Sequence, residues 1–403
     1  MLENRDIIII SGDWDRHPGP VQHITRLLVR RNRVMWVSGI PLRPPRVQLR
    51  DVMRILEKGS KMLATTMHSY DLSIPVKEVH PFFVPYYDSP ALRRFNDRLL
   101  RRLLVKRIRE LGFKDYVLLV QNPMAAGVVG GLAERSSHYL CIDDYGANEG
   151  AFRNVGRCEN EVLERVDSCF CMSDILLKTR IPRSGQVSFF PEGVDLEHFK
   201  VTGSPPPGPL AGVRKPIVGY AGLLASWVDF ELIARCAVAY PHVTFVILGA
   251  VKTDISTIMG LGNVKCLGHI PYEILPRYVE HFDVGLIPRI INRLTVAMNP
   301  LKLLEYLALE LPVVSTNLPE VRKFGDLAYV AEDHDQFLRL LEKALHDNTP
   351  ERNRARRAQA EEFSWQAIID RMSEVIQSVE ANMTTHRGVG SFEGGRDAHK
   401  EVI

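Results

Sequence analysis

The segment Asn299-Pro-Leu-Lys-Leu-Leu-Glu combines a helix start with one basic and one acidic side chain. The Asn-Pro entry predicts that a helix begins here, so Lys302 falls in its first turn and Glu305 one turn later on the same face. The N–H groups and dipole of a helix N-terminus attract anions, and the Lys302 ammonium adds a full positive charge. A diphosphate suits this position, and Glu305 suits sugar or ribose hydroxyls. An ordinary solvated helix with a Lys–Glu pair is the alternative interpretation.

Two adjacent acids, Asp143 and Asp144, follow the apolar run Tyr139-Leu-Cys-Ile, which indicates a buried strand. At the carboxyl end of a parallel strand these acids would face a ligand cleft, where burial and like charge raise the pKa of a carboxyl group. Asp143 and Asp144 are therefore our candidates for a catalytic base. In the alternative interpretation, Asp144 caps a turn before Gly146 and neither acid takes part in chemistry.

The first loop of the chain, Asp13-Trp-Asp-Arg-His-Pro-Gly, offers a second set of candidates. Asp15 or His17 is an alternative base, and Gly19 leaves room for an acceptor molecule. The Asp-Trp-Asp tripeptide has the spacing of a metal-binding DxD motif, but that tripeptide occurs often by chance. We therefore predict no metal site in this loop.

The elements that would position these residues alternate between short apolar runs and amphipathic stretches, which is typical of a parallel sheet wrapped by helices. In the first half, strands are predicted at Ile7–Ile10, Arg33–Val37, Tyr116–Gln121, His138–Ile142, Ser168–Met172 and Gln186–Phe190. Helices are predicted at Val21–Arg30, Pro90–Leu111, Ala125–Glu134, Arg157–Val166 and Asp174–Thr179. Residues 1–201 would thus form a Rossmann-like domain.

The alternation stops over residues 202–216, where proline and glycine are so frequent that we predict an extended linker. It resumes over residues 217–362, with strands predicted at Ile217–Tyr220, Thr244–Leu248, Lys265–Leu267, Val284–Ile287 and Pro312–Ser315. Helices are predicted there at Asp229–Tyr240, Tyr272–Tyr278, Pro300–Leu309 and Asp335–Asp347. The fold class is therefore α/β with two Rossmann-like domains, whose parallel sheets face each other across a ligand cleft.

The end of the chain changes character again. Apolar residues recur at helical spacing from Phe363 to Glu380, which predicts a helix over residues 363–382 that packs back towards the N-terminal domain. Residues 383–403 are rich in glycine and poor in apolar side chains, so we expect a flexible tail.

The composition excludes several classes of protein. The 403 residues are 45% apolar and 25% charged with a net charge of +3, so no global field favours a nucleic-acid partner. None of the six cysteines forms a CxxC pair, and no apolar run approaches the length of a membrane span. The initial isoleucine run resembles a strand and not a signal peptide, so we expect a cytoplasmic protein.

One stretch is locally basic. Ala91–Arg109 contains eight basic residues and the single acid Asp97, interleaved with apolar side chains, which predicts a basic amphipathic helix in the first domain. Such a helix can lie on an anionic membrane, with each cation contributing about 1 kcal/mol, and would bring the cleft to a lipid-linked acceptor. A helix that packs by one face and is merely solvated on the other is the alternative. No nucleic-acid-binding motif accompanies these cations, so we predict no such partner.

Five segments of the second half, in order and in register, resemble the donor-domain signatures of GT-B glycosyltransferases. The resemblance is to family 4-like enzymes, especially bacterial ones that build surface polysaccharides and exopolysaccharides. It extends more weakly over Cys141–Phe199, which ends in Pro191-Glu-Gly-Val-Asp-Leu-Glu-His-Phe. The five segments are Gly219-Tyr-Ala-Gly-Leu-Leu-Ala-Ser-Trp-Val-Asp, Phe245-Val-Ile-Leu-Gly, Asn263-Val-Lys-Cys-Leu-Gly-His, Phe282-Asp-Val-Gly-Leu-Ile-Pro-Arg and Pro300-Leu-Lys-Leu-Leu-Glu-Tyr.

The resemblance implies roles for the donor-side residues. Gly222 would let the backbone approach the donor phosphates, and Arg289 and Lys302 would bind the diphosphate in place of a metal ion. Glu305 would hold the ribose hydroxyls. The segment at Gly268 and His269 would line the base pocket, and Asn299 would stand at the helix entry of the donor site. No cofactor is implied beyond the nucleotide sugar, for which UDP is favoured.

The chain departs from the retaining members of this fold. Many of them carry a second acid eight positions before the match to Glu305, and this position is Ala297. An inverting enzyme needs instead a base in the N-terminal domain. Asp143 also matches the catalytic acid of glucuronosyltransferase-like relatives.

We therefore expect an inverting, metal-independent glycosyltransferase of class EC 2.4. It would transfer a sugar from a nucleotide donor to a glycan or lipid-linked acceptor in polysaccharide biosynthesis, as a cytoplasmic or peripheral membrane protein. A nucleotide-sugar epimerase of the same fold and a non-catalytic nucleotide-sugar-binding subunit are the alternatives.

Overall fold

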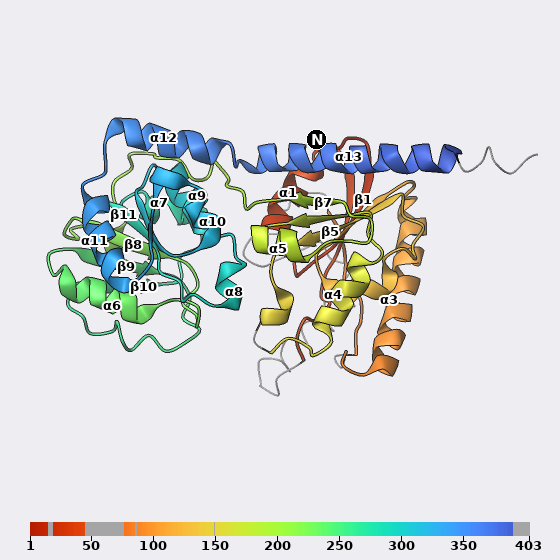
Figure 1. Cartoon of the computed structure of the whole chain (residues 1–403), viewed down its shortest axis with the longest axis horizontal. Helices are drawn as coiled ribbons and strands as arrows, with labels where there is room; N and C mark the ends of the chain where they lie inside the picture. The colour runs from red at the N-terminus through yellow and green to blue at the C-terminus, as the bar shows by residue number, and fades with distance from the viewer. Residues whose placement is uncertain (15–18, 45–75, 85–86, 149, 390–403) are drawn as a thin grey trace, which may run out of the picture.

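The structure is a computed structural model of the 403-residue chain. It describes residues 1–14, 19–44, 76–84, 87–148 and 150–389, with side chains described up to residue 383. Two α/β units lie next to each other along the long axis, and two C-terminal helices run along one side of both (Figure 1).

The first unit is built on a seven-stranded sheet in which every pairing is parallel. Its spatial order is β3-β2-β1-β4-β5-β6-β7, so the chain reverses its winding direction between β1 and β4. The strands are β1 Asp6–Ile10, β2 Arg33–Val37, β3 Lys77–Val79, β4 Val117–Val120, β5 Ser136–Cys141, β6 Ser168–Cys171 and β7 Val187–Phe189. The helices are α1 Pro20–Leu28, α3 Pro90–Leu111, α4 Val155–Leu163 and α5 Asp174–Thr179.

The second unit is a six-stranded parallel sheet of order β10-β9-β8-β11-β12-β13, which reverses between β8 and β11. Its strands are β8 Ile217–Ala221, β9 Thr244–Leu248, β10 Val264–Gly268, β11 Val284–Ile287, β12 Val313–Thr316 and β13 Ala328–Ala331. Its helices are α6 Phe230–Ala239, α7 Pro276–Val279, α8 Arg293–Val296, α9 Leu301–Ala308, α10 Pro319–Arg322 and α11 His334–Leu345. Ligands of open parallel sheets bind outside the carboxyl ends of the strands at such reversals.

The C-terminal helices tie the two units together. Helix α12, Pro350–Glu361, packs against α9 of the second unit, and α13, Trp365–Val389, packs against α1 and β5 of the first. The apolar face of α13 joins the buried cluster that covers one side of β1, where Ile7 and Ile9 point. Burying one such side chain contributes about 1.5–3 kcal/mol, so α13 supplies a layer of the first core. The residues of this face are Trp365, Ile368, Ile369, Met372 and Ile376.

All eleven predicted strands are confirmed to within one or two residues at each end, and the helix predicted over Pro90–Leu111 has those bounds. The helix predicted over Ala125–Glu134 is wrong, because the chain forms only a 3₁₀ turn at Pro123–Val128. Gly130 and Ala133 follow it with φ of +72° and +63°, which no α-helix accommodates. Strands β3 and β13 and helix α12 were not predicted.

The predicted end of the C-terminal helix is too early. Helix α13 continues to Val389, so the first part of the expected tail is helical. The rest of that tail lies outside the described residues. Within the described part of the chain, no helix is both long enough and apolar enough to cross a bilayer.

Candidate active site

Helix α9 carries the predicted basic and acidic pair. Lys302 and Glu305 form an ion pair, and their side chains are only 15% and 2% exposed. The N-cap of this helix is Pro300. Within the helix, the Tyr306 hydroxyl accepts a hydrogen bond from the Ala221 N–H at 2.9 Å. The start of α9 is therefore held against the carboxyl end of β8.

Gly222 follows β8 and meets the loop that follows β9. Its N–H donates to the Leu248 carbonyl at 2.9 Å, and a Cβ added at Gly249 would lie 1.8 Å from the Gly222 carbonyl oxygen. A Cβ on Gly222 itself would lie 2.8 Å from the Tyr220 hydroxyl. Close approach of the two loops thus requires glycine at position 249, whereas a Cβ on Gly222 would meet only the end of the Tyr220 side chain.

Arg289 follows β11, on the other side of the sheet reversal. Its main chain is fixed by a hydrogen bond from its N–H to the Thr316 hydroxyl at 3.0 Å, and its guanidinium lies 5.8 Å from the centre of the Trp227 ring. The guanidinium also interacts with the Tyr220 hydroxyl, whose pKa is raised by burial and lowered by Arg289. Nη1 of Arg289 is buried and has no hydrogen-bond partner among the described residues. A buried, unused N–H donor is what an anionic ligand would require.

The remaining donor-side candidates lie in different surroundings. His269 is exposed and directly follows Gly268, which ends β10 with a φ of +71°. Asn299 donates from Nδ2 to the Met172 carbonyl of the first unit at 3.0 Å, so it joins the two units. Ala297 is buried in the core cluster of the first unit, and a longer acid there would have no room without repacking.

Asp143 follows β5, separated from its last residue by Ile142, and is half-buried. Oδ2 accepts a hydrogen bond from Asn148 Nδ2 at 3.5 Å, whereas Oδ1 is buried without a partner among the described residues. Burial raises the pKa of Asp143 above its ordinary value, and the negative charges of Asp144 and Glu159 act in the same direction. A carboxylate of this kind is a stronger base than a solvated one.

Asp144 has a different environment from Asp143, although the two are adjacent. It is buried and accepts from Arg180 of the first unit at 2.8 Å and from Arg293 of helix α8 at 2.9 Å. Two guanidinium groups stabilise the carboxylate and occupy its lone pairs. The arrangement suits a contact between the units better than proton transfer.

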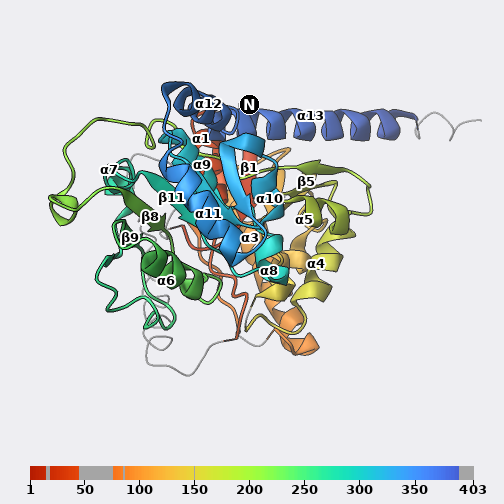
Figure 2. The ribbon, with the colours of Figure 1, turned by 60° about the vertical axis from the view of Figure 1, so that its left-hand side comes forward.

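A second contact between the units lies between α5 and α10 (Figure 2). Glu320 accepts from the Asp174 N–H at 2.8 Å, and Lys323 pairs with both carboxylates at 2.7 Å. Together with Asp144, these pairs bring the carboxyl ends of the two sheets close to each other.

The first-loop candidates are only partly described. Asp15 and His17 lie outside the described residues. Gly19 is the N-cap of α1, with an extended backbone and its N–H donated to the Gln22 side chain at 3.2 Å.

Several polar residues of the site were missed by sequence reasoning. Gln121 follows β4, hydrogen-bonds to Ser11 after β1 and donates to the Tyr145 hydroxyl at 2.7 Å, so polar groups flank the reversal of the first sheet. Glu192 is 6% exposed and lies near Lys302 and Glu305. A polar residue directly after a buried strand is the signal that could have identified Ser11 and Gln121.

Residues 215–347 match the family model described as group 1 glycosyl transferases. A Bacillus subtilis protein, TuaH, which is assigned to teichuronic acid biosynthesis as a glycosyltransferase, is 32% identical over 210 residues. This match covers 49% of the chain and 53% of TuaH, so the chain spans about half the length of that relative.

Solved structures match nearly the whole chain at low identity. Sucrose-phosphate synthase from Thermosynechococcus elongatus has a TM-score of 0.68 at 15% identity, with 94% of this chain and 100% of that chain covered. Anabaena HepE, solved with UDP and glucose, has a TM-score of 0.63 at 15% identity, with 92% and 99% covered. At this identity the likeness concerns the fold. Residues 215–347 are thus similar to the group 1 glycosyltransferases, and the chain has the GT-B fold of two parallel Rossmann-like sheets.

Proposed function

We propose that the chain is a glycosyltransferase that moves a sugar from a UDP-linked donor to a glycan or lipid-linked acceptor of a cell-surface polysaccharide. The family match of residues 215–347 and the similarity to TuaH support the reaction class and the setting. HepE, which was solved with UDP-glucose as well as with UDP and glucose, supports the choice of nucleotide. The observation that supports the proposal most is that two cations lie where the second sheet reverses its winding. These are Arg289, with its unused N–H donor, and Lys302 at the start of α9.

In the proposed reaction, Arg289 and Lys302 bind the diphosphate and neutralise the charge that develops when the bond from the anomeric carbon to the diphosphate breaks. The start of α9 adds main-chain N–H groups to the same anion. Glu305 accepts hydrogen bonds from the ribose. Gly222 leaves the loop backbone free to approach the phosphates, and the base lies near Gly268 and His269. Neutralisation by these cations would make a metal ion unnecessary.

The acceptor reacts from the first unit. Asp143 accepts the proton of the acceptor hydroxyl while the hydroxyl oxygen bonds to the anomeric carbon from the face opposite the diphosphate, which inverts the configuration. Its partnerless Oδ1 and raised pKa support this role. Ala297 supports inversion too, because it supplies no acid on the donor side.

The reaction is tested by two measurements on the same protein. A thermal-shift screen against UDP-, GDP- and dTDP-sugars identifies the donor, because a bound donor raises the melting temperature by mass action. Incubation with the labelled donor and a glycan acceptor then follows the fate of the sugar. Transfer supports the proposal, free epimerised product would assign an epimerase, and binding without turnover would assign a non-catalytic subunit.

Asp143→Asn tests the base separately. The amide keeps the shape but accepts no proton, so we expect kcat to fall about 10²–10⁴-fold while the donor affinity stays within a factor of about two. Asp254→Asn, at an exposed loop of the second unit, is the control. Near-wild-type turnover by the Asp143 variant would move the base to Asp144, Asp15 or His17.

We also propose that α3 holds the enzyme on an anionic membrane. Of its eight cations, Arg93 is paired with Glu161, while Arg107 and Lys106 share Glu110. The other five have no acidic partner among the described residues, and these are Arg94, Arg98, Arg101, Arg102 and Arg109. All five are exposed and recur at intervals of three, four and seven residues, so they form one stripe along the helix.

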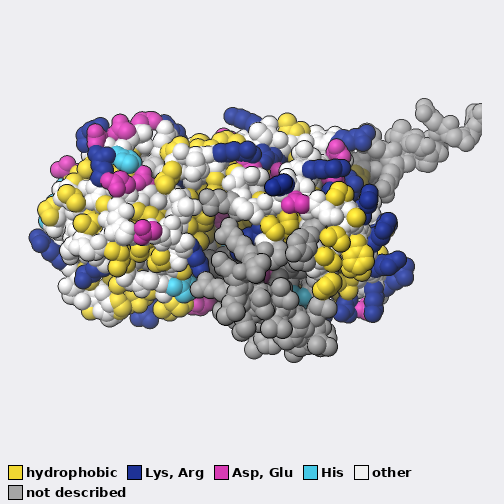
Figure 3. All heavy atoms as spheres, turned by 90° about the horizontal axis from the view of Figure 1, so that it is seen from below, with side chains coloured by type: hydrophobic (Ala, Val, Ile, Leu, Met, Phe, Trp, Pro, Cys, Tyr) yellow, Lys and Arg dark blue, Asp and Glu magenta, His cyan; other side chains and the backbone are white. Residues whose placement is uncertain are grey.

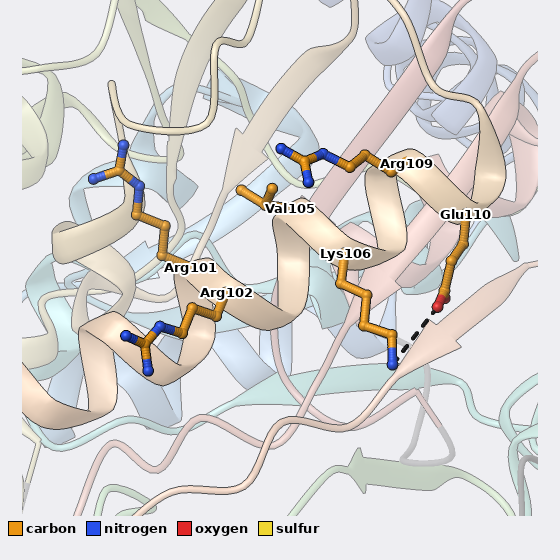
Figure 4. A pocket seen from close by; sticks show the side chains of 6 residues that line it. All are labelled: Arg101, Arg102, Val105, Lys106, Arg109 and Glu110. Carbon is orange, nitrogen blue, oxygen red and sulfur yellow. Dashed lines mark ion pairs between the residues drawn. The ribbon is translucent and has the colours of Figure 1, made fainter.

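The stripe lies at the end of the molecule. Figure 3 shows the Lys and Arg side chains gathered at the edge to which α3 belongs, and Figure 4 shows Arg101, Arg102 and Arg109 extending from the helix around a shallow hollow. Phe95 of the same helix is 46% exposed and adds apolar surface to it. Five cations at about 1 kcal/mol each suffice for reversible, salt-sensitive binding to anionic lipid.

Liposome sedimentation tests the membrane proposal. Wild type should sediment with vesicles that contain anionic lipid at low salt and stay in solution with neutral vesicles. Replacement of Arg98 and Arg102 by glutamine should weaken this binding about tenfold or more. The same double change at Arg339 and Arg354, two exposed cations outside α3, should have no effect. A wild-type protein that stays in solution would contradict the proposal.

A further inference from the structure

The segment from Pro191 to Phe199 leaves the first sheet and ends against the second. Val194 donates its N–H to the Phe363 carbonyl at 2.9 Å, and the Trp365 N–H donates to the Val194 carbonyl at 3.2 Å. Further along, the His198 ring stacks on Tyr272 at 4.3 Å, and its Nε2 lies 2.8 Å from the Tyr272 carbonyl oxygen. The segment is thus fixed at both ends beside the start of α9.

Glu192 lies in this segment with an unusual carboxyl group. Its side chain is 6% exposed, and Oε1 has no hydrogen-bond partner among the described residues. Burial raises its pKa well above the ordinary value, with a further contribution from the charge of Glu305 and an opposing one from Lys302. Lys302 is already paired with Glu305, so it does not satisfy both acids. A buried acceptor without a donor is rare in folded proteins and indicates a missing partner.

The missing partner must bring hydroxyl donors to two neighbouring carboxyl groups. Glu305 uses one oxygen for Lys302, and both charged groups lie close enough to Glu192 to act on the pKa of its carboxyl group. Glu305 lies about one helical turn, roughly 5 Å, from the N-terminus of α9. In a nucleoside diphosphate, the vicinal 2′- and 3′-hydroxyls of the ribose lie at about that distance from the phosphates.

We propose that Glu192 is a further donor-site residue, which together with Glu305 binds the ribose 2′,3′-diol and makes the enzyme specific for ribonucleoside over 2′-deoxyribonucleoside diphosphates. The inference rests on the proposed function, because it takes the diphosphate to bind at α9. A 2′-deoxyribose would leave one of the two buried acceptors unpaired, and sites built to bind a hydroxyl reject analogues that lack it. The donor class is therefore UDP, GDP or ADP sugars, and dTDP sugars are excluded.

The test is calorimetric titration of the full chain with UDP, GDP and ADP, and with the 2′-deoxy form of each nucleotide. Wild type should bind the ribonucleotide of its preferred base about tenfold or more tighter than the deoxy analogue. Glu192→Met removes both oxygens at similar volume, so it should weaken ribonucleotide binding about tenfold and leave deoxynucleotide binding unchanged. Glu192→Gln keeps one acceptor oxygen and should retain most of the preference. Glu197→Gln, 91% exposed in the same segment, is the matched control.

The outcomes separate this inference from the proposed function. A wild-type chain that binds none of the nucleoside diphosphates would overturn both. Tight binding by wild type, with the ribonucleotide preference of wild type retained in Glu192→Met, would overturn the role of Glu192 alone. Equal binding of the ribo- and deoxyribonucleotide by wild type would also overturn the role of Glu192. This measurement needs no variant, so it remains decisive if the Glu192→Met protein fails to fold.

Discussion

Replacement of Lys302 by methionine removes the cation from a buried ion pair at the centre of the donor site. The Lys302 and Glu305 side chains are 15% and 2% exposed, and the carboxyl group of Glu192 is near both. Methionine fills a similar volume, so packing changes little. The main consequence is that Glu305 keeps its charge in a buried place beside a second acid.

The magnitude depends on pH. Breaking one partner of a buried pair costs about 3–5 kcal/mol when the remaining charge cannot be relieved. Burial already raises the pKa of Glu305 above 4.5 while Lys302 lowers it, so loss of Lys302 raises it further. A carboxyl whose pKa is higher in the folded than in the unfolded state loses stability as pH rises above the unfolded value. We expect a loss within about 1 kcal/mol at pH 5 and of about 3 kcal/mol or more at pH 8.

Urea unfolding followed by tryptophan fluorescence at both pH values measures this difference. The double variant Lys302→Met/Glu305→Gln removes the stranded charge and should regain most of the loss at pH 8. Lys200→Met breaks an exposed pair with Glu197 and should stay within about 0.5 kcal/mol of wild type. A Lys302 variant as stable as wild type at pH 8, or a double variant no better than the single, would refute the reasoning.

Three further predictions concern the scaffold. Arg293→Gln removes the α8 contact to Asp144, so solution scattering should show a larger radius of gyration, while global stability changes by less than about 1 kcal/mol because Arg293 is 73% exposed; an unchanged radius would contradict this. Burial lowers the pKa of His138 from 6.5 to about 3, so the folded chain cannot take up this proton, and stability should fall by up to about 5 kcal/mol as pH falls from 6.5 to 3; His138→Gln should flatten that acid limb in urea titrations. Gly193→Ala should cost about 1–3 kcal/mol in thermal unfolding, because its Cβ would lie 2.6 Å from the Trp365 ring, and a neutral effect would mean that the indole moves freely.

Local pattern was sufficient for most elements of both units. The runs at Ile7–Ile10 and Phe245–Leu248 are apolar on both faces because both faces of a parallel sheet are covered, and such runs are visible without any tertiary information. The Pro90–Leu111 helix ends at Gly112, whose φ of +61° is a helix stop that a sequence signals directly. Strand β3 escaped detection, because its residues Lys77-Glu-Val include two charged side chains and form no apolar run.

Neighbours along the chain are enough to predict two parallel-sheet units, the junction between them and a Lys302–Glu305 pair one helical turn apart. Which buried groups meet depends on how the chain folds in three dimensions. The tertiary structure joined Asp144 to Arg180 and Arg293, left Asp143 with a partnerless oxygen, and brought Glu192 to Lys302 and Glu305 from more than a hundred residues away. Burial and charge at a site are sums over segments that are distant in sequence, and no local pattern contains that sum.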